Sequence, residues 1–295
     1  MKTYFIRHGY KLDIDNKTHE SIWNNNIIAI HFPCTLDSKE GDPDTKSLNP
    51  DEYKPSDKKA IKTLIELSNN GGYVCAFYDY NKECKIGYVE PKTKIEYITG
   101  MWGNINKKDG REAILKGLTL TKVKYLNKIE SIRLLFAQPQ QGTICRWHII
   151  GDRVKNIIEN IKYGLSYESL MPSEQEVLCS EYLRSNLASK YPFKCLASCV
   201  LPIGRTMKDI DIIGINEIGE IILAQVTHNS NEEISDKIGA LEKYTTDNIV
   251  AHRIMFCNCK NYFFKNNIYY LPIRKVYDEF ISTNIGKNWI NIVFS

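Results

Sequence analysis

The sequence lacks any apolar run long enough to cross a membrane, and its start, MKTYFIRHGYKLD, lacks the apolar core of a signal peptide. It also lacks an excess of charge, because 39 basic and 35 acidic side chains leave a net charge of +4. Proteins dedicated to nucleic acid usually concentrate more positive charge on one face, so this balance permits such binding without requiring it. We expect a cytoplasmic protein with no membrane partner.

The nine cysteines form neither a disulfide framework nor an ordinary zinc motif. Their number is odd, and several stand in apolar, strand-like segments where a reduced thiol packs as a small apolar group. A zinc site would have to combine Cys195 and Cys199 with Cys257 and Cys259, and these spacings differ from the usual two-residue knuckle. The sequence therefore favours reduced thiols in the core.

The first half of the chain alternates short apolar segments with polar turns. It predicts helices around residues 21–25, 60–68 and 152–165, and strands at residues 3–7, 27–32, 73–78, 85–89, 93–98, 118–125, 132–137 and 143–150. This order is typical of a mixed domain with a curved or barrel-like antiparallel sheet, and we assign it to residues 1–165.

One stretch of this half, GGYVCAFYDYNKECKIGYVE, combines a Gly turn, an apolar strand, a polar hairpin and a second strand with an inner Gly. It resembles the PUA-like superfamily, including the EVE-type domains, and the resemblance implies a recognition domain that receives a modified base in a pocket. Aromatic faces would stack on such a base. Trp23, Trp102 and Trp147 could serve, although each taken singly is better explained as a core residue.

A polar loop, QPQQGTICRW, places Arg146 where it could meet DNA phosphates, although a plain surface turn is the more ordinary use of such a loop. A second loop, at residues 203–206, offers Arg205 for the same purpose.

Residues 166–295 predict a second domain. Helices are expected at residues 173–189, 231–247 and 277–281, strands at 196–202, 249–257 and 268–273, and a hairpin at 208–228. The order helix, strand, hairpin, helix, strand is typical of a mixed α/β sheet with helices on its faces.

The hairpin, KDIDIIGINEIGEIILAQVTH, carries polar residues on otherwise apolar strands. Asp209 and Asp211 stand on the first strand, and Gln225 stands on the second. Asp211 faces Gln225 if the turn holds an odd number of residues and Ala224 if it holds an even number, and the pattern leaves both registers open. Carboxylate and amide oxygens suit a hard divalent cation, so the hairpin is a candidate half of a metal site.

Glu176 lies on a largely apolar stripe of the helix at residues 173–189 and has two candidate roles. It could close a capping box, Ser173-x-x-Glu176, at the start of the helix. Alternatively, it could point toward the hairpin and add a carboxylate to the metal site.

Residues 172–257 resemble the PD-(D/E)xK restriction-endonuclease-like superfamily, in the style of its Mrr-like branch. In that pattern a helix Glu precedes an Asp before a hairpin, and a Glu or Gln stands two residues before a Lys on the next strand. Glu176, Asp211 and Gln225 occupy the matching positions. The resemblance implies a restriction-endonuclease-like mixed sheet flanked by helices, and Mg²⁺- or Mn²⁺-dependent hydrolysis of DNA by a restriction or antiviral defence enzyme. Cutting both strands would favour a homodimer.

The sequence departs from this pattern at Thr227, which stands where the family has lysine. A hydroxyl cannot supply the positive charge that orients the attacking water and stabilises the phosphate. Either Lys208 or Lys237 supplies that charge from elsewhere, or the domain binds or senses nucleic acid without cutting it. We favour the active nuclease, with catalytic residues Asp211, Gln225, Thr227, Glu176 and Lys237, metal ligands Asp211, Gln225, Glu176 and Asp209, and nucleic-acid contacts Trp102, Trp147, Arg146 and Arg205.

Overall fold

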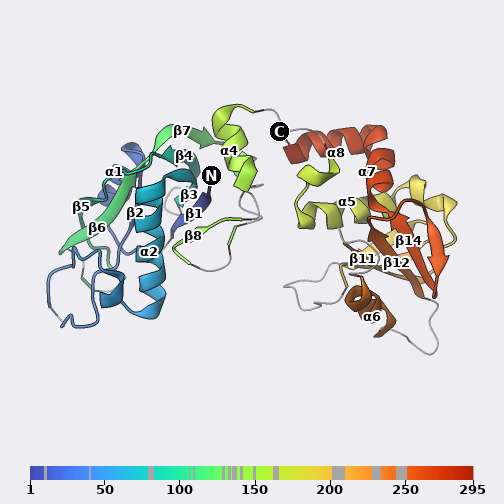
Figure 1. The fold of residues 1–295 in the computed structure, drawn as a ribbon, viewed down its shortest axis with the longest axis horizontal. Coiled ribbons are helices and arrows are strands. Elements are labelled where there is room, and N and C mark those ends of the chain that lie inside the picture. The colour runs from blue at the N-terminus through green and yellow to red at the C-terminus, as the bar shows by residue number, and fades with distance from the viewer. Residues whose placement is uncertain are drawn as a thin grey trace. The chain divides into compact units, whose positions relative to one another are not determined.

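A computed structural model describes residues 1–9, 12–39, 41–78, 83–105, 107–108, 110–127, 130–131, 134, 138–139, 142–148, 151–161, 166–200, 210–227, 234–243 and 251–294. The chain divides into two compact units, Met1–Lys162 and Tyr163–Ser295, shown in Figure 1, whereas the boundary expected from the sequence follows residue 165. We refer to them as unit 1 and unit 2.

Unit 1 contains two open sheets. The larger has the strand order β7-β4-β3-β1-β8, in which β1 and β3 pair in parallel and the other neighbours are antiparallel. The smaller, β2-β6-β5, is antiparallel. The described strands form no closed barrel, so two open sheets replace the expected barrel-like sheet. The strands are β1 (Thr3–His8), β2 (Ile27–Ile30), β3 (Gly72–Tyr78), β4 (Glu83–Val89), β5 (Glu96–Met101), β6 (Glu112–Thr119), β7 (Thr121–Leu126) and β8 (Ile144–Arg146).

Among the fully described elements, these sheets are accompanied by the helices α1 (Asn16–Asn24), α2 (Pro55–Asn70) and α4 (Gly151–Glu159) and by a short 3-10 turn, η1 (Pro50–Glu52). The apolar stripe of α2 is buried in the core, as its helical spacing predicts. The strand expected at 118–125 is two strands, β6 and β7, because Leu120 between them donates its N–H to the Asn26 carbonyl instead. Most of the strand expected at 132–137 lies outside the described residues.

Unit 2 is built on one six-stranded mixed sheet of order β13-β14-β12-β11-β10-β9. Neighbours β11 and β12, and β12 and β14, run parallel, and the remaining pairs are antiparallel. Its strands are β9 (Leu196–Val200), β10 (Ile212–Asn216), β11 (Ile221–Val226), β12 (Ala251–Cys257), β13 (Phe263–Lys265) and β14 (Ile268–Pro272).

The helices of unit 2 cover both faces of this sheet. In Figure 1, α5 (Pro172–Arg184), α7 (Ile273–Ser282) and α8 (Asn284–Phe294) lie on one side, and α6 (Ser235–Lys243) lies on the other. Two separate apolar cores result, because Ile222 and Ala224 pack toward the first group while Leu223 packs with Ile234 and Leu241 of α6. Two short turns, η2 (Tyr167–Ser169) and η3 (Asn186–Lys190), flank α5. The chain is thus a mixed α/β protein with several mixed sheets.

The end of the chain is more helical than the sequence suggests. The short helix expected at 277–281 is the longer α7, and α8 and the edge strand β13 were not expected. Trp289, Ile290 and Val293 of α8 pack on the core of unit 2. Among the described residues, no helix has the length and apolarity needed to span a bilayer.

All nine cysteines are free thiols, and Cys75, Cys84, Cys179, Cys195 and Cys257 are buried. The zinc combination does not assemble, because Cys195 hydrogen-bonds the Ser185 carbonyl and Cys199 contacts Ser180, while Cys257 and Cys259 interact with each other.

The close pairing of β9 and β10 predicts that Gly214→Ala destabilises unit 2. A Cβ at this position would lie 2.2 Å from the Ser198 carbonyl oxygen and 2.5 Å from Leu196 Cδ1. We expect a loss of about 1–3 kcal/mol in the free energy of unfolding, measured by urea denaturation. The control is Gly239→Ala in α6, where no atom lies within 4 Å and alanine should stabilise the helix by about 0.5–1 kcal/mol. Equal stability of Gly214→Ala and the parent would contradict this strand pairing.

Candidate functional site

The turn between β10 and β11 fixes the register that the sequence leaves open. Ile212 pairs with Ala224, and beyond the last ladder pair Asn216 donates its N–H to the Glu220 carbonyl at 2.9 Å. The loop between Asn216 and Glu220 ends at Gly219, whose φ of +87° favours glycine. The turn is therefore odd. The ladder ends at the pair Ile212–Ala224, and Asp211, one residue before it, donates its N–H to the Ala224 carbonyl at 3.1 Å.

The Asp211 carboxylate is held between the hairpin and α6. Its Oδ2 accepts a 2.7 Å hydrogen bond from the Val226 N–H and lies 3.6 Å from Lys237 Nζ. Lys237 also donates to the Val226 carbonyl at 2.5 Å, which anchors its ammonium beside the carboxylate. Both side chains keep solvent contact, with 19% of Asp211 and 39% of Lys237 exposed, so the pair contributes little to stability. A cationic lysine thus reaches the site from α6.

Gln225 and Thr227 are buried beside this pair, with exposures of 3% and 7%. Gln225 lies in register with Met255 of β12, and the Thr227 N–H donates to the Phe256 carbonyl at 2.9 Å. Thr227 therefore extends the ladder beyond β11 and supplies no charge to the site.

Glu176 does not cap α5. The helix begins at Pro172, and Glu174 closes the first turn by accepting a 2.8 Å hydrogen bond from the Met171 N–H. The capping box expected from Ser173 and Glu176 is therefore wrong, because the helix starts earlier and another glutamate fills the role.

The charges of Glu176 and Asp211 both act on one buried thiol. Burial, followed by the nearby charges of Asp211 and Glu176, raises the pKa of Cys179. Cys179 belongs to α5, and Asp211 precedes β10. That Glu176 and Asp211 act together in one site stays a prediction.

The oxygen chemistry of these residues suits Mg²⁺ or Mn²⁺. Asp211 offers a carboxylate, Gln225 an amide oxygen and Glu176 a second carboxylate, and Mg²⁺ keeps several of its waters in protein sites. Within the described ranges, no set of three or more His, Cys, Asp or Glu residues is close enough to hold a metal ion. Asp209, Lys208, Arg205 and His228 lie outside the described residues.

The side chains expected to contact nucleic acid in unit 1 are either buried or paired with another residue of the chain. Trp102 and Trp147 are only 6% and 2% exposed, and Trp147 packs edge-on against Phe5 with centroids 5.1 Å apart. Neither ring presents an open face for a base. Arg146 donates from Nε and Nη2 to Glu66 Oε2, the first at 3.1 Å. Burial raises the pKa of Glu66, but hydrogen bonds from Arg146, Lys2 and Tyr4 overcome this and hold it at about 2.

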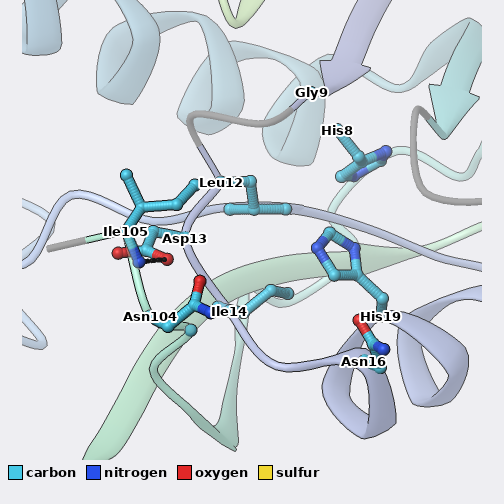
Figure 2. Close-up of a pocket in the computed structure, with 10 residues that line it drawn as sticks. His8, Gly9, Leu12, Asp13, Ile14, Asn16, His19, Asn104 and Ile105 are labelled. Atoms are coloured by element: carbon cyan, nitrogen blue, oxygen red, sulfur yellow. Dashed lines mark hydrogen bonds between the residues drawn. The ribbon is translucent and has the colours of Figure 1, made fainter. Parts of the chain in front are cut away.

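Unit 1 contains a cavity that no sequence motif predicts (Figure 2). Its volume is about 230 Å³, and Figure 2 shows the polar side chains of Asp13, Asn16, His19 and Asn104 around it. Asp13 Oδ1 accepts a 3.2 Å hydrogen bond from the Ile105 N–H, which ties the two sides of the cavity together. The lining residues are His8, Gly9, Leu12, Asp13, Ile14, Asn16, His19, Gly103, Asn104 and Ile105.

His8 forms the buried wall of this cavity. Its Nε2 accepts a 3.0 Å hydrogen bond from the Ala29 N–H, and its ring stacks on Tyr78 with centroids 4.2 Å apart. Burial, and then the proximity of His19, lower the pKa of His8 to about 3. The ring is therefore neutral near pH 7, with its proton on Nδ1.

Comparison of the chain with protein-family models, with curated proteins and with solved structures finds no match.

The low pKa of His8 predicts a pH-dependent stability of unit 1. Unfolding releases His8 to its ordinary pKa near 6.5, so the unfolded state binds one more proton between pH 6.5 and 3, and stability falls as the pH falls through that window. The expected contribution is about 1.4 kcal/mol for each pH unit below 6.5. His8→Gln, which keeps an acceptor for Ala29, should lose this contribution in urea denaturation at pH 7 and pH 5. His148→Gln, at an exposed position, should keep the parental pH dependence.

Proposed function

We propose that this chain is a metal-dependent DNA endonuclease of restriction or defence type, which hydrolyses phosphodiester bonds at a site around Asp211. The observation that carries the proposal is Lys237, whose Nζ lies 3.6 Å from Asp211 Oδ2. It offers, from α6, the positive charge that Thr227 cannot provide on the strand.

The order of elements in unit 2 supports the proposal. Helix α5 is followed by β9, β10 and β11, then by α6 and β12, with Asp211 and Gln225 on the two strands of the hairpin and Glu176 on the first helix. This is the order, and these are the positions, that the resemblance to the PD-(D/E)xK superfamily implies.

The residues of the site have separable roles in this reaction. A bound Mg²⁺ or Mn²⁺ would polarise the scissile phosphate and lower the pKa of a bound water. The Val226 N–H fixes the orientation of the Asp211 carboxylate, which would hold the cation together with the neutral oxygen of Gln225. Lys237, anchored on the Val226 carbonyl, orients the attacking water and stabilises the charge that develops on the phosphate. Glu176 and Asp209 complete the acidic set, and Thr227 shapes the site without charge.

The cavity of unit 1 supports a role for that unit in choosing the target. Its amide, imidazole and carboxylate groups are those that read the edge of an extruded base, and we assign modified-base recognition to it. The resulting enzyme acts on DNA as a homodimer in the cytoplasm, where the cysteines stay reduced.

A second candidate function is binding or sensing of nucleic acid by a degenerate nuclease fold. It is favoured by the internal contacts of the site, because the Val226 N–H and Lys237 Nζ already partner the Asp211 carboxylate.

Substitutions at Asp211 and Lys237 test the nuclease. We expect Mg²⁺-dependent cleavage of plasmid DNA to fall at least 10²-fold in Lys237→Ala and to vanish in Asp211→Ala, because the first removes a transition-state charge and the second a metal ligand. The matched control is Lys243→Ala, an exposed lysine in the last turn of the same helix. It should cleave at the parental rate.

Titration calorimetry with Mg²⁺ separates the two candidate functions. The nuclease binds Mg²⁺ and loses this affinity in Asp211→Ala. Salt-dependent DNA binding that is unchanged in Asp211→Ala, together with no Mg²⁺ binding and no cleavage in any metal, would establish the non-cutting module instead.

Asn104 provides a test of base recognition in the cavity. We expect the parent to cleave duplexes carrying a modified base, such as methylcytosine or hydroxymethylcytosine, faster than plain duplexes. Asn104→Leu should reduce this preference about tenfold, the effect of losing one hydrogen bond worth about 1.4 kcal/mol, with the rate on plain DNA unchanged. Asn24→Leu, exposed at the end of α1 and outside the cavity lining, is the control. Equal cleavage of modified and plain DNA by the parent contradicts this assignment.

A further inference from the structure

Unit 2 carries a run of aromatic rings at its surface that the site around Asp211 does not use. Phe264 is 53% exposed and Tyr262 is 38% exposed, and Tyr191 and Tyr269 are partly exposed beside them. We call these four residues the aromatic surface. Large apolar side chains that gather at a surface mark a site of interaction more often than isolated ones do.

The four rings form a continuous track. The centroids of Tyr191 and Tyr262 are 5.1 Å apart, those of Tyr262 and Tyr269 are 6.4 Å apart, and those of Tyr269 and Phe264 are 4.5 Å apart. Tyr262 and Tyr269 are nearly parallel, with an interplanar angle of 15°. The track therefore joins the turn before β9 to the β13–β14 edge.

The track rests on buried groups that hold its rings in place. Phe193 is fully buried, stacks on Tyr191 with centroids 5.0 Å apart, and meets Tyr269 edge-on at 5.3 Å. The Asn216 side chain, also buried, donates to the Phe193 carbonyl at 3.2 Å and links this support to the hairpin turn. A rigid aromatic platform loses little conformational entropy when a planar ligand stacks on it.

Lysines are interleaved with these rings. The segments at residues 190–194 and 260–269, KYPFK and KNYFFKNNIY, contain Lys190, Lys194, Lys260 and Lys265 and no acidic residue. Lys190 Nζ lies 5.2 Å from the Tyr191 ring centroid and pairs with Glu279 at 2.6 Å. For Lys194, Lys260 and Lys265, which are exposed, no carboxylate partner is found in the part of the chain that the structure describes. The two segments therefore carry positive charge that suits a polyanion, while the neighbouring acids Glu279 and Glu220 are paired with Lys190 and His252.

We propose that the aromatic surface binds single-stranded nucleic acid, with bases stacked on the rings and phosphates paired with the lysines. Stacking on successive aromatic side chains and a cationic margin are the two elements of single-strand binding without sequence preference. A duplex keeps its bases stacked on one another, so a flexible strand fits the exposed rings better. A peptide with acidic side chains would match the lysines but would leave the rings without planar partners.

The proposal deepens the proposed function, since both take nucleic acid as the ligand, but it concerns a different surface. Tyr191, Phe193 and Tyr269 adjoin the core formed with α5, α7 and α8, whereas Lys237 belongs to α6 on the other face of the sheet. Single-strand binding can therefore be measured in EDTA, without metal and without cleavage.

The test measures binding of a fluorescein-labelled 20-mer of deoxythymidine to the full chain by fluorescence anisotropy in EDTA. We expect Tyr262→Ala and Phe264→Ala each to weaken binding roughly tenfold, the effect of losing one stacked base. Tyr262→Phe, which keeps the ring, should bind as the parent does. Ile218→Ala removes an apolar side chain that is more exposed than either ring from the β10–β11 turn, and it should also leave binding unchanged. Lys260→Gln and Lys265→Gln should each make the slope of log affinity against log salt concentration less steep. The expected change is about 0.7 for each phosphate that the side chain no longer neutralises.

Several results would overturn the proposal. The parent could fail to bind the 20-mer, or could bind a blunt duplex of equal length better. The ring variants could bind as the parent does, or could change only the oligomeric state measured by light scattering, which would identify the surface as a contact between copies of the chain. Circular dichroism confirms that each variant is folded. Cleavage by the parent without single-strand binding would contradict this proposal alone, and single-strand binding without cleavage in any metal would contradict the proposed function alone.

Discussion

The side chain of Asn216 fixes the geometry on which the site in unit 2 depends. It is 2% exposed, and its Oδ1 accepts hydrogen bonds from the N–H groups of Ile218 and Glu220 at 3.1 and 2.8 Å. Its Nδ2 donates to the Glu220 carboxylate and to the Phe193 carbonyl, so all of its polar atoms are satisfied inside the turn. A slip of one residue in this register would turn every side chain of β10 to the opposite face relative to β11. The register that brings the Asp211 carboxylate to the Val226 N–H at the end of β11 follows from this amide.

This dependence explains why the register could not be read from the sequence. Strands β10 and β11 are covered by helices on both faces, so the apolar runs around Ile212 and Ile222 show no alternation. Without alternation, the hydrophobic pattern does not distinguish one register from the next. The information lies in the turn chemistry, where an asparagine that bonds its own backbone and a glycine with positive φ select an odd loop.

At the start of α5, two glutamates are candidates for the capping role, and the sequence does not show which of them fills it. Pro172 is well suited to the first position of a helix, which makes Glu174 the residue that reaches back to the cap, although Ser173 and Glu176 have the same spacing as a capping box. Glu176 therefore takes no part in this cap. Strong periodicity placed α2 and α5, but burial of Trp102 and Trp147 was decided by packing between distant strands. The cavity was invisible for a similar reason, since His8, Asn16 and Asn104 come together only in three dimensions.

A lysine delivered by a helix has different consequences from one carried by the strand. A lysine two residues after Gln225 would be held at a fixed distance from it by the strand itself. Lys237 is held instead by its bond to the Val226 carbonyl and by the packing of Ile234 and Leu241 against the sheet. Its position relative to Asp211 therefore depends on how α6 packs on the sheet. A shift of α6 would change the distance between the Lys237 ammonium and the Asp211 carboxylate. The aromatic surface adjoins the core on the other face of the sheet, which is built with α5, α7 and α8. A shift of α6 therefore does not act directly on its rings. The Asp211–Lys237 pair and the aromatic surface therefore depend on helices packed against opposite faces of one sheet.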